Sequence, residues 1–158
     1  MSENVGYSDP QGAPIVYLAA PWKDRDRAKE IRTQLQEAGI VINSRWLDFV
    51  GSEELAKDEQ KRQEALNDIE DVLNADTVVV LNSIYSEGKA AETGMAIILM
   101  KGIVLIGEPS NVFHYLDFPK VKTVEEAIPI VLNYPWKMTQ LRLSREAVAE
   151  VKPLVTES

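Results

Sequence analysis

Two uninterrupted apolar runs constrain the fold more than any other feature of this sequence. They are Ile15–Ala20 (IVYLAA) and the valine-rich segment Asp76–Leu81 (DTVVVL). Short runs without polar alternation are typical of strands that are covered on both faces, as in parallel sheets. We therefore predict a sheet at the centre of the fold, with helices on both of its sides.

Helix-like segments separate the strand-like ones. Within Asp24–Ala38, apolar residues recur at spacings of three and four, and Gly39 is suited to end that helix. Further strands are predicted at Ile40–Asn43, at Ile103–Ile106 and near Val121, and further helices within Leu55–Leu73, over Lys89–Lys101 and from Val124 to about Asn133. The Lys89–Lys101 segment is apolar nearly all round, which predicts a buried helix. Strands alternating with helices predict an α/β fold with a parallel sheet of about five strands.

This alternation is confined to residues 14–133, which we predict to form one domain. Residues 1–13 are polar and lack a periodic apolar pattern, which is typical of a flexible arm. Residues 134–158 form an appendix that suits an amphipathic helix, packed on this domain or on a neighbouring subunit. The longest apolar stretch, Met95–Met100, is far shorter than a membrane span, and no secretory signal is visible. We therefore expect a cytoplasmic protein without membrane contact.

Composition excludes several kinds of function. The chain has no cysteine, which rules out disulfides, thiolate metal sites and cysteine nucleophiles. Its single histidine, His114, argues against a multi-histidine metal centre and is better explained as a loop or core residue than as a catalytic base. A formal net charge of −8 disfavours nucleic acid polymers as partners. A small anionic ligand stays compatible with this charge, because local donors can override it.

Ligands of open parallel sheets bind beyond the carboxyl ends of the strands. Four predicted loops meet there: Ala20–Lys23, Ser44–Asp48, Asn82–Gly88 and Gly107–His114. The first loop lacks the glycine patterns that bind dinucleotides or triphosphates. Its Trp22 either stacks on a planar ligand or covers a helix start. Arg45, in the second loop, either meets a ligand or forms a surface salt bridge.

An isolated carboxylate marks the helix after the third loop. Glu92 is the only acid between Gly88 and Lys101, and we place it in the first turn of that helix. There the helix dipole stabilises an ionised carboxylate, which suits a nucleophile, although a Glu that merely favours the dipole explains the position as well. A second acid, Asp68, borders the apolar face of the preceding helix. One ionised and one protonated carboxyl group form the pair that breaks a glycosidic bond.

Several short segments occur in a characteristic order. They are YLAAPW (17–22), SRWL (44–47), Asp68 eight residues before the Asp of a strand that begins Ala75-Asp76, G-x-x-x-E-x-G-x-A (88–96) and SNVFHYL (110–116). Together they resemble the nucleoside 2-deoxyribosyltransferase superfamily, which includes the deoxynucleoside 5′-monophosphate N-glycosidases. The resemblance covers roughly residues 15–132. It implies a three-layer fold of flavodoxin-like or Rossmann-like type.

The resemblance also implies a reaction. Members cleave a base–sugar bond through a covalent glycosyl ester, so Glu92 matches the nucleophile, Asp68 the acid that assists the departing base, and Tyr17 the tyrosine that steers the nucleophile. They need neither a metal nor an organic cofactor. They are commonly homo-oligomers in which a neighbour's loop completes each site, and Asn111 and the C-terminal appendix are the candidates for that role.

The resemblance leaves the substrate open between a nucleoside and a nucleoside 5′-monophosphate. Ser86 stands where enzymes acting on free nucleosides tend to carry an acid, and a hydroxyl tolerates a 5′-phosphate that a carboxylate would repel. The first loop lacks the Gly, Ser and Arg usual for phosphate, so Lys23 or Lys89 would supply the charge. The expected substrate contacts are Ala20, Pro21, Trp22, Arg45, Trp46, Ser86, Gly88 and Asn111. The alternative function is a non-catalytic nucleotide-binding protein that senses or sequesters its ligand.

Overall fold

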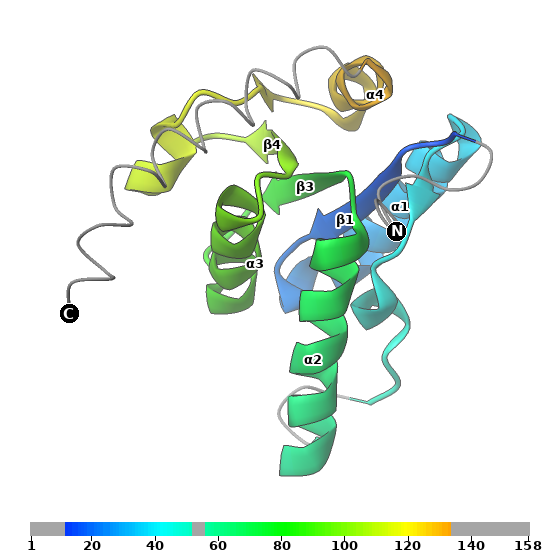
Figure 1. Ribbon diagram of the computed structural model, residues 1–158, viewed down its shortest axis with the longest axis vertical. Coiled ribbons are helices and arrows are strands. Elements are labelled where there is room, and N and C mark those ends of the chain that lie inside the picture. Colours follow the sequence, from blue (N-terminus) through cyan, green and yellow to red (C-terminus); the bar gives the residue numbers. More distant parts are fainter. Residues whose placement is uncertain (1–11, 52–55, 134–158) are drawn as a thin grey trace, which may run out of the picture.

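Five parallel strands form the centre of the fold. The computed structural model describes residues 12–51 and 56–133. The strands are β1 (Ile15–Ala19), β2 (Val41–Ile42), β3 (Thr77–Asn82), β4 (Gly102–Gly107) and β5 (Lys120–Val121). They lie in the order β2-β1-β3-β4-β5, and every neighbouring pair is parallel (Figure 1). The predicted α/β class and the parallel five-stranded sheet are confirmed.

Helices cover both faces of this sheet. The α-helices are α1 (Arg25–Glu37), α2 (Asp58–Asn74), α3 (Glu87–Ile98) and α4 (Val124–Leu132), and three short 3-10 helices are η1 (Trp22–Asp24), η2 (Arg45–Asp48) and η3 (Val112–Tyr115). Figure 1 shows α2 and α3 side by side below the sheet and α4 above it, and α1 packs with α4. The result is the predicted three-layer arrangement. The residues between the layers are apolar and almost wholly buried, above all those of β1, β3 and β4.

The α3 helix differs from its prediction in two ways. Ser86 accepts a hydrogen bond from the backbone N–H of Lys89 and caps the helix, so α3 begins at Glu87. The helix ends at Ile98. Glu92 is therefore in the second turn, and its predicted place in the first turn was wrong. The predicted burial all round was also wrong, because Ile98 is 66% exposed and Ala91 and Gly94 are exposed too. Small and apolar residues on this helix face outward as well as inward.

Two predictions about the chain ends stay predictions. The arm over residues 1–13 and the appendix over residues 134–158 lie almost entirely outside the described residues. Among the helices of residues 12–51 and 56–133, none combines the length and apolar character needed to cross a bilayer.

The end of β4 requires a glycine. Gly107 has a φ of 121°, and a Cβ at this position would lie 2.7 Å from the backbone oxygen of Asn82 on β3. We expect Gly107→Ala to lower the free energy of unfolding by about 1–3 kcal/mol, measured by urea denaturation. Gly94→Ala is the matched control, because no atom lies within 4 Å of its Cβ and alanine favours a helix. Equal effects of the two substitutions would contradict the steric explanation.

Candidate active site

A cavity of about 460 Å³ opens at the carboxyl ends of the strands. It lies where the sheet order reverses, between the segments that follow β1, β2 and β3, with α2 as its remaining wall. Open α/β sheets bind ligands at this switch point, and the volume is within the range of small-molecule sites. The described residues that line it are Ala20, Trp22, Trp46, Phe49, Ala56, Lys61, Glu64, Ala65, Asp68, Ser86, Gly88, Lys89 and Glu92.

Tyr17 and Glu92 form a hydrogen-bonded pair beside this cavity. The Tyr17 hydroxyl donates to Glu92 Oε1 at 2.7 Å, and both side chains are buried. Tyr17 comes from the centre of β1 and Glu92 from α3, so the bond joins the sheet to the helix that covers it. Burial, followed by the charges of Glu92 and Asp68, raises the pKa of Tyr17 far above its usual value. The hydroxyl therefore keeps its proton and orients the carboxylate.

Asp68 completes a group of three polar side chains. It projects from α2, lines the cavity and interacts with Tyr17. Its pKa is raised from 3.8 to about 6, mainly by burial and to a smaller extent by the neighbouring carboxylates Glu64 and Asp71, while the Tyr17 hydrogen bond and Arg45 oppose the shift. Within the described part of the chain, Asp68 Oδ1 has no hydrogen-bond partner. The arrangement thus combines a carboxylate oriented by a phenol with a second carboxyl group that can carry a proton near neutral pH.

Three aromatic side chains form one wall of the cavity. The rings of Trp22 and Trp46 are 6.2 Å apart, and Phe49 meets the Trp22 ring edge-on at 5.9 Å. The Arg25 guanidinium lies 4.7 Å from the Trp22 ring centre, and Trp46 Nε1 donates to the backbone oxygen of Leu18 at 2.9 Å. These contacts hold the rings in place. A wall of this kind suits a flat, partly apolar ligand group.

Arg45 holds η2 in position and does not line the cavity. Its backbone N–H and its Nε donate to the carboxylate of Asp71 at 3.0 and 2.9 Å, and its Nη2 lies 2.7 Å from Asp71 Oδ1. This ion pair fastens η2 to α2, and with it the adjacent Trp46. The salt bridge, one of the two alternatives for Arg45, is what the structure contains.

The N-terminus of α3 forms another part of the cavity wall. Ser86, Gly88 and Lys89 line the cavity there. Because Ser86 Oγ accepts the helix-capping bond, its hydroxyl proton can still be donated to a ligand. Lys23, the other residue expected to supply positive charge, does not line the cavity.

The remaining predicted residues lie outside the cavity. Pro21 is buried and its carbonyl accepts a hydrogen bond from the Asp24 amide. Asn111 caps η3 by accepting from the amides of Phe113 and His114. His114 is buried and accepts the Ser110 amide at Nδ1, so it is part of the loop structure. Of the predicted contacts, Ala20, Trp22, Trp46, Ser86 and Gly88 come together with Glu92 and Asp68.

Sequence analysis missed two charged residues of the α2 wall, Lys61 and Glu64. With Asp68, which it did identify, they line the cavity from successive turns of α2. They lie in an acidic run that is more simply explained as a solvated helix face, but their spacing of three and four residues is a signal that they share one side. Phe49 and Ala56 carried no comparable signal, because they belong to an irregular connection.

The described ranges contain no group of three or more His, Asp or Glu side chains placed to hold a metal ion. What the fold and the cavity define is an α/β protein with a ligand-sized cavity at the switch point of its sheet, lined by two carboxyl groups. Residues 16–134 match the family model of the nucleoside 2-deoxyribosyltransferases. The chain belongs to this family of glycosyl-transferring enzymes, and the resemblance found in the sequence is confirmed.

Solved structures support the fold assignment. The chain resembles a 2-deoxyribosyltransferase from Bacillus psychrosaccharolyticus, with 22% identity over 72% of this chain and 90% of the other, at a TM-score of 0.58. A conserved protein from Enterococcus faecalis shares 18% identity over 76% and 98% of the two chains, with a TM-score of 0.63. A CMP N-glycosidase from Clostridium botulinum shares 17% identity over 74% and 97%, with a TM-score of 0.51. No curated protein matches the sequence.

Proposed function

We propose that this protein cleaves the N-glycosidic bond of a nucleoside or nucleoside 5′-monophosphate, through a covalent glycosyl ester on Glu92. The observation that carries the proposal is the Tyr17–Glu92 hydrogen bond beside Asp68, in the wall of a ligand-sized cavity. Family membership supports the same chemistry. The two carboxyl groups differ in environment, which lets one act as a nucleophile and the other as an acid.

In the first step, Glu92 attacks the anomeric carbon of the sugar. A bond forms between a Glu92 carboxylate oxygen and C1′ while the bond between C1′ and the base nitrogen breaks, and its electron pair leaves with the base. Asp68, whose pKa of about 6 keeps a fraction protonated near neutral pH, delivers a proton to that base. Tyr17 holds Glu92 Oε1 during the attack, which reduces the number of orientations the carboxylate can adopt.

In the second step, the glycosyl ester is released. Water or a nitrogen of a second base attacks C1′, and Glu92 departs as a carboxylate. Asp68, now ionised, accepts the proton that the attacking group loses. Hydrolysis and transfer therefore use the same residues and differ only in the acceptor.

Two parts of the cavity wall suggest how a substrate lies in it. The base would lie against Trp22, Trp46 and Phe49, because flat rings stack on aromatic walls. The sugar would then point its 5′ group toward Ser86, Gly88 and the amides at the start of α3. That part of the wall suits either a hydroxyl or a phosphate, since a helix N-terminus favours anions and Ser86 carries no charge.

A panel of deoxynucleosides and deoxynucleoside monophosphates, with and without an acceptor base, tests the proposal. Release of free base without an acceptor identifies a hydrolase, and base exchange alone identifies a transferase. Tight binding without turnover of any member would favour a ligand sensor, the alternative function. No binding and no turnover would contradict both.

We further propose that the protein is a homo-oligomer. Leu66, Ile69 and Leu73 on α2 and Ile98 on α3 are each more than 40% exposed, and the two helices lie in the same layer. Exposed apolar groups of this kind favour association between subunits. Light scattering with size-exclusion chromatography should give a mass above the 17.7 kDa of one chain. Ile69→Glu should reduce that mass, and a monomeric parent protein would contradict the proposal.

A further inference from the structure

A buried lysine lies one helical turn before the proposed nucleophile. Lys89 is only 5% exposed, although its ammonium is strongly hydrated in water. Its Nζ donates to the Asn82 side-chain oxygen at 2.7 Å and to the backbone oxygen of Ile84 at 2.5 Å. Its side chain also forms part of the cavity wall. Lys89 therefore joins α3 to the end of β3 and to the connection between them.

The acceptor for Lys89 is itself held firmly. Asn82 Nδ2 donates to the backbone oxygen of Glu108 at 2.5 Å and to Ser110 Oγ at 3.0 Å. These bonds fix the direction of the amide, so that Asn82 Oδ1 faces Lys89. The Lys89 ammonium thus binds an amide of fixed orientation at the carboxyl ends of the strands.

The charges around Lys89 explain how an ammonium is tolerated there. Burial lowers its pKa, while the carboxylates of Asp24 on η1 and Glu92 on α3 oppose that shift. His114 on η3 is a further titratable group in this neighbourhood, and its pKa is lowered by burial and by the charges of Lys89 and Lys120. The attraction is mutual, so whatever Glu92 contributes to keeping Lys89 charged, Lys89 contributes to keeping Glu92 ionised.

Glu92 needs such a partner because of where α3 begins. Its position in the second turn is beyond the free amides of the helix start, where the dipole acts most strongly. Tyr17 from β1 donates a hydrogen bond to the Glu92 carboxylate and also interacts with Asp68 from α2. Lys89, one turn earlier on the same helix and in the same cavity wall, supplies positive charge next to Glu92.

We propose that Lys89 is a positioning residue for the nucleophile: its charge keeps Glu92 ionised in the cavity, and its two hydrogen bonds fix the turn from β3 into α3. This inference rests on the proposed function, because it assigns Lys89 a task in the same reaction. Lys89 does not need to touch the substrate to perform it.

Lys89→Met tests the proposal by removing the charge while preserving length and apolar volume. We expect kcat to fall about tenfold or more, with a smaller change in KM, and the acidic limb of the pH–rate profile to move up by about one pH unit. Lys89→Gln, which retains an amide donor but no charge, should show the same shift of the limb. An unshifted limb in both variants would overturn the electrostatic role.

Lys101→Met is the matched control for burying a methionine in place of a lysine. Lys101 is 2% exposed, and its Nζ donates to the backbone oxygen of Leu73. Both residues lie at the amino ends of the strands, away from the cavity. We expect this variant to lose stability but to keep the pH–rate profile of the parent. A shift as large as that of Lys89→Met would mean that loss of any buried lysine disturbs the site, and would overturn the proposal.

A measurement on the native chain covers the case in which the neutral variants do not fold. The ¹³C signal of the Glu92 carboxyl, assigned by its loss in Glu92→Gln, should remain that of an ionised group near pH 6, where Asp68 is half protonated. If Glu92 titrates together with Asp68, Lys89 does not hold it ionised and the inference fails. This readout needs no turnover, so it separates failure of the inference from failure of the proposed function.

Discussion

Replacing Glu92 by Gln is expected to abolish turnover, with kcat for base release falling by about 10⁴-fold or more. The amide has nearly the same shape and can accept the Tyr17 hydrogen bond, so the cavity should stay intact. It cannot form the glycosyl ester, however, because a neutral amide is a poor nucleophile. Substrate binding, measured by calorimetry, should survive while single-turnover base release disappears.

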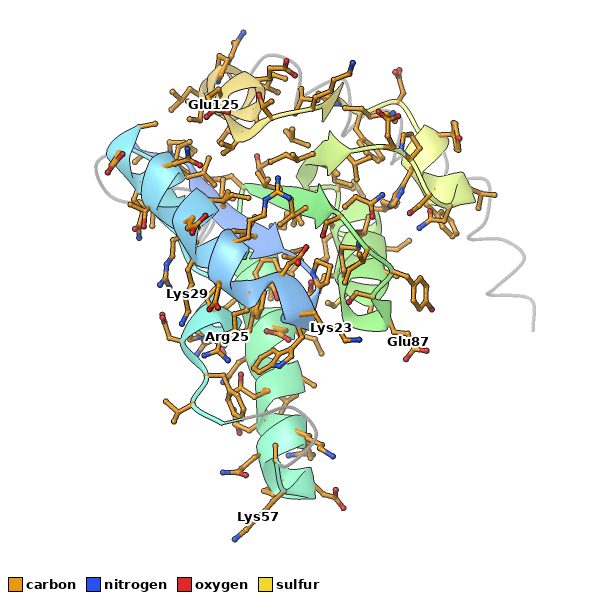
Figure 2. The ribbon with its side chains drawn as sticks, turned by 180° about the vertical axis from the view of Figure 1, so that it is seen from behind. Lys23, Arg25, Lys29, Lys57, Glu87 and Glu125 are labelled. Atoms are coloured by element: carbon orange, nitrogen blue, oxygen red, sulfur yellow. The ribbon has the colours of Figure 1, made fainter. Side chains whose placement is uncertain are left out.

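A matched control lies on the same helix. Glu87 is in the first turn of α3, is exposed and points away from the protein in Figure 2. Glu87→Gln removes the same charge and should keep kcat within about twofold of the parent, since exposed groups contribute little. Comparable losses in both variants would show a general charge effect and would contradict nucleophilic catalysis.

The ester itself is open to direct detection. A 2-fluoro-2-deoxy nucleoside should glycosylate Glu92 slowly, and the resulting ester should turn over more slowly still, because fluorine destabilises the positively charged transition state of both steps. Mass spectrometry should then find one sugar added to the peptide that contains Glu92. An active parent protein that never carries this adduct would require direct attack by the acceptor instead.

The second large effect is expected for Asp68→Asn. Loss of the proton donor should lower kcat by about 10²- to 10³-fold for unmodified bases. In a nucleoside with a quaternised base, such as 7-methyl-2′-deoxyguanosine, the base leaves without protonation. The Asp68→Asn substitution should therefore lower kcat for this substrate much less. If both substrates slow equally, Asp68 is not the acid that assists the leaving base.

The pH dependence of the parent protein follows from the same group. The proposed proton donor, Asp68, would act in its protonated form, so rates with unmodified bases should fall as the pH rises through about 6. Stability should respond too. The pKa is raised from 3.8 to about 6 in the folded chain, so the folded state binds this proton more tightly and loses stability as pH rises across that interval. Asp68→Asn, which carries no charge, should be more stable than the parent above pH 6 by urea denaturation.

The sheet could be predicted from the sequence because its strands are buried on both faces. β1, β3 and β4 were each read from apolar runs that needed no tertiary information, and their ends agree within one residue. The start of α3 was harder. Ser86 is a good capping residue, but periodicity began only at Lys89, so the first turn was assigned to the loop.

The candidate site was predictable only in part, because its residues come from several elements. Glu92, Asp68 and Tyr17 were named from a motif, but the bond between Tyr17 and Glu92 spans 75 positions of sequence and depends on how α3 packs on β1. The sequence identified Lys89 only as a candidate source of positive charge for a phosphate. Its two acceptors, Asn82 and Ile84, become neighbours only once the connection between β3 and α3 has closed over the sheet.

The aromatic wall and the carboxyl pair are built from different segments. Trp22, Trp46 and Phe49 come from η1, η2 and the residue after η2, whereas Glu92 and Asp68 come from α3 and α2. The part of the protein that would recognise a base can therefore be altered without changing the part that would break the bond. In practical terms, a library restricted to these three aromatic positions offers a route to new base preferences on an unchanged catalytic apparatus.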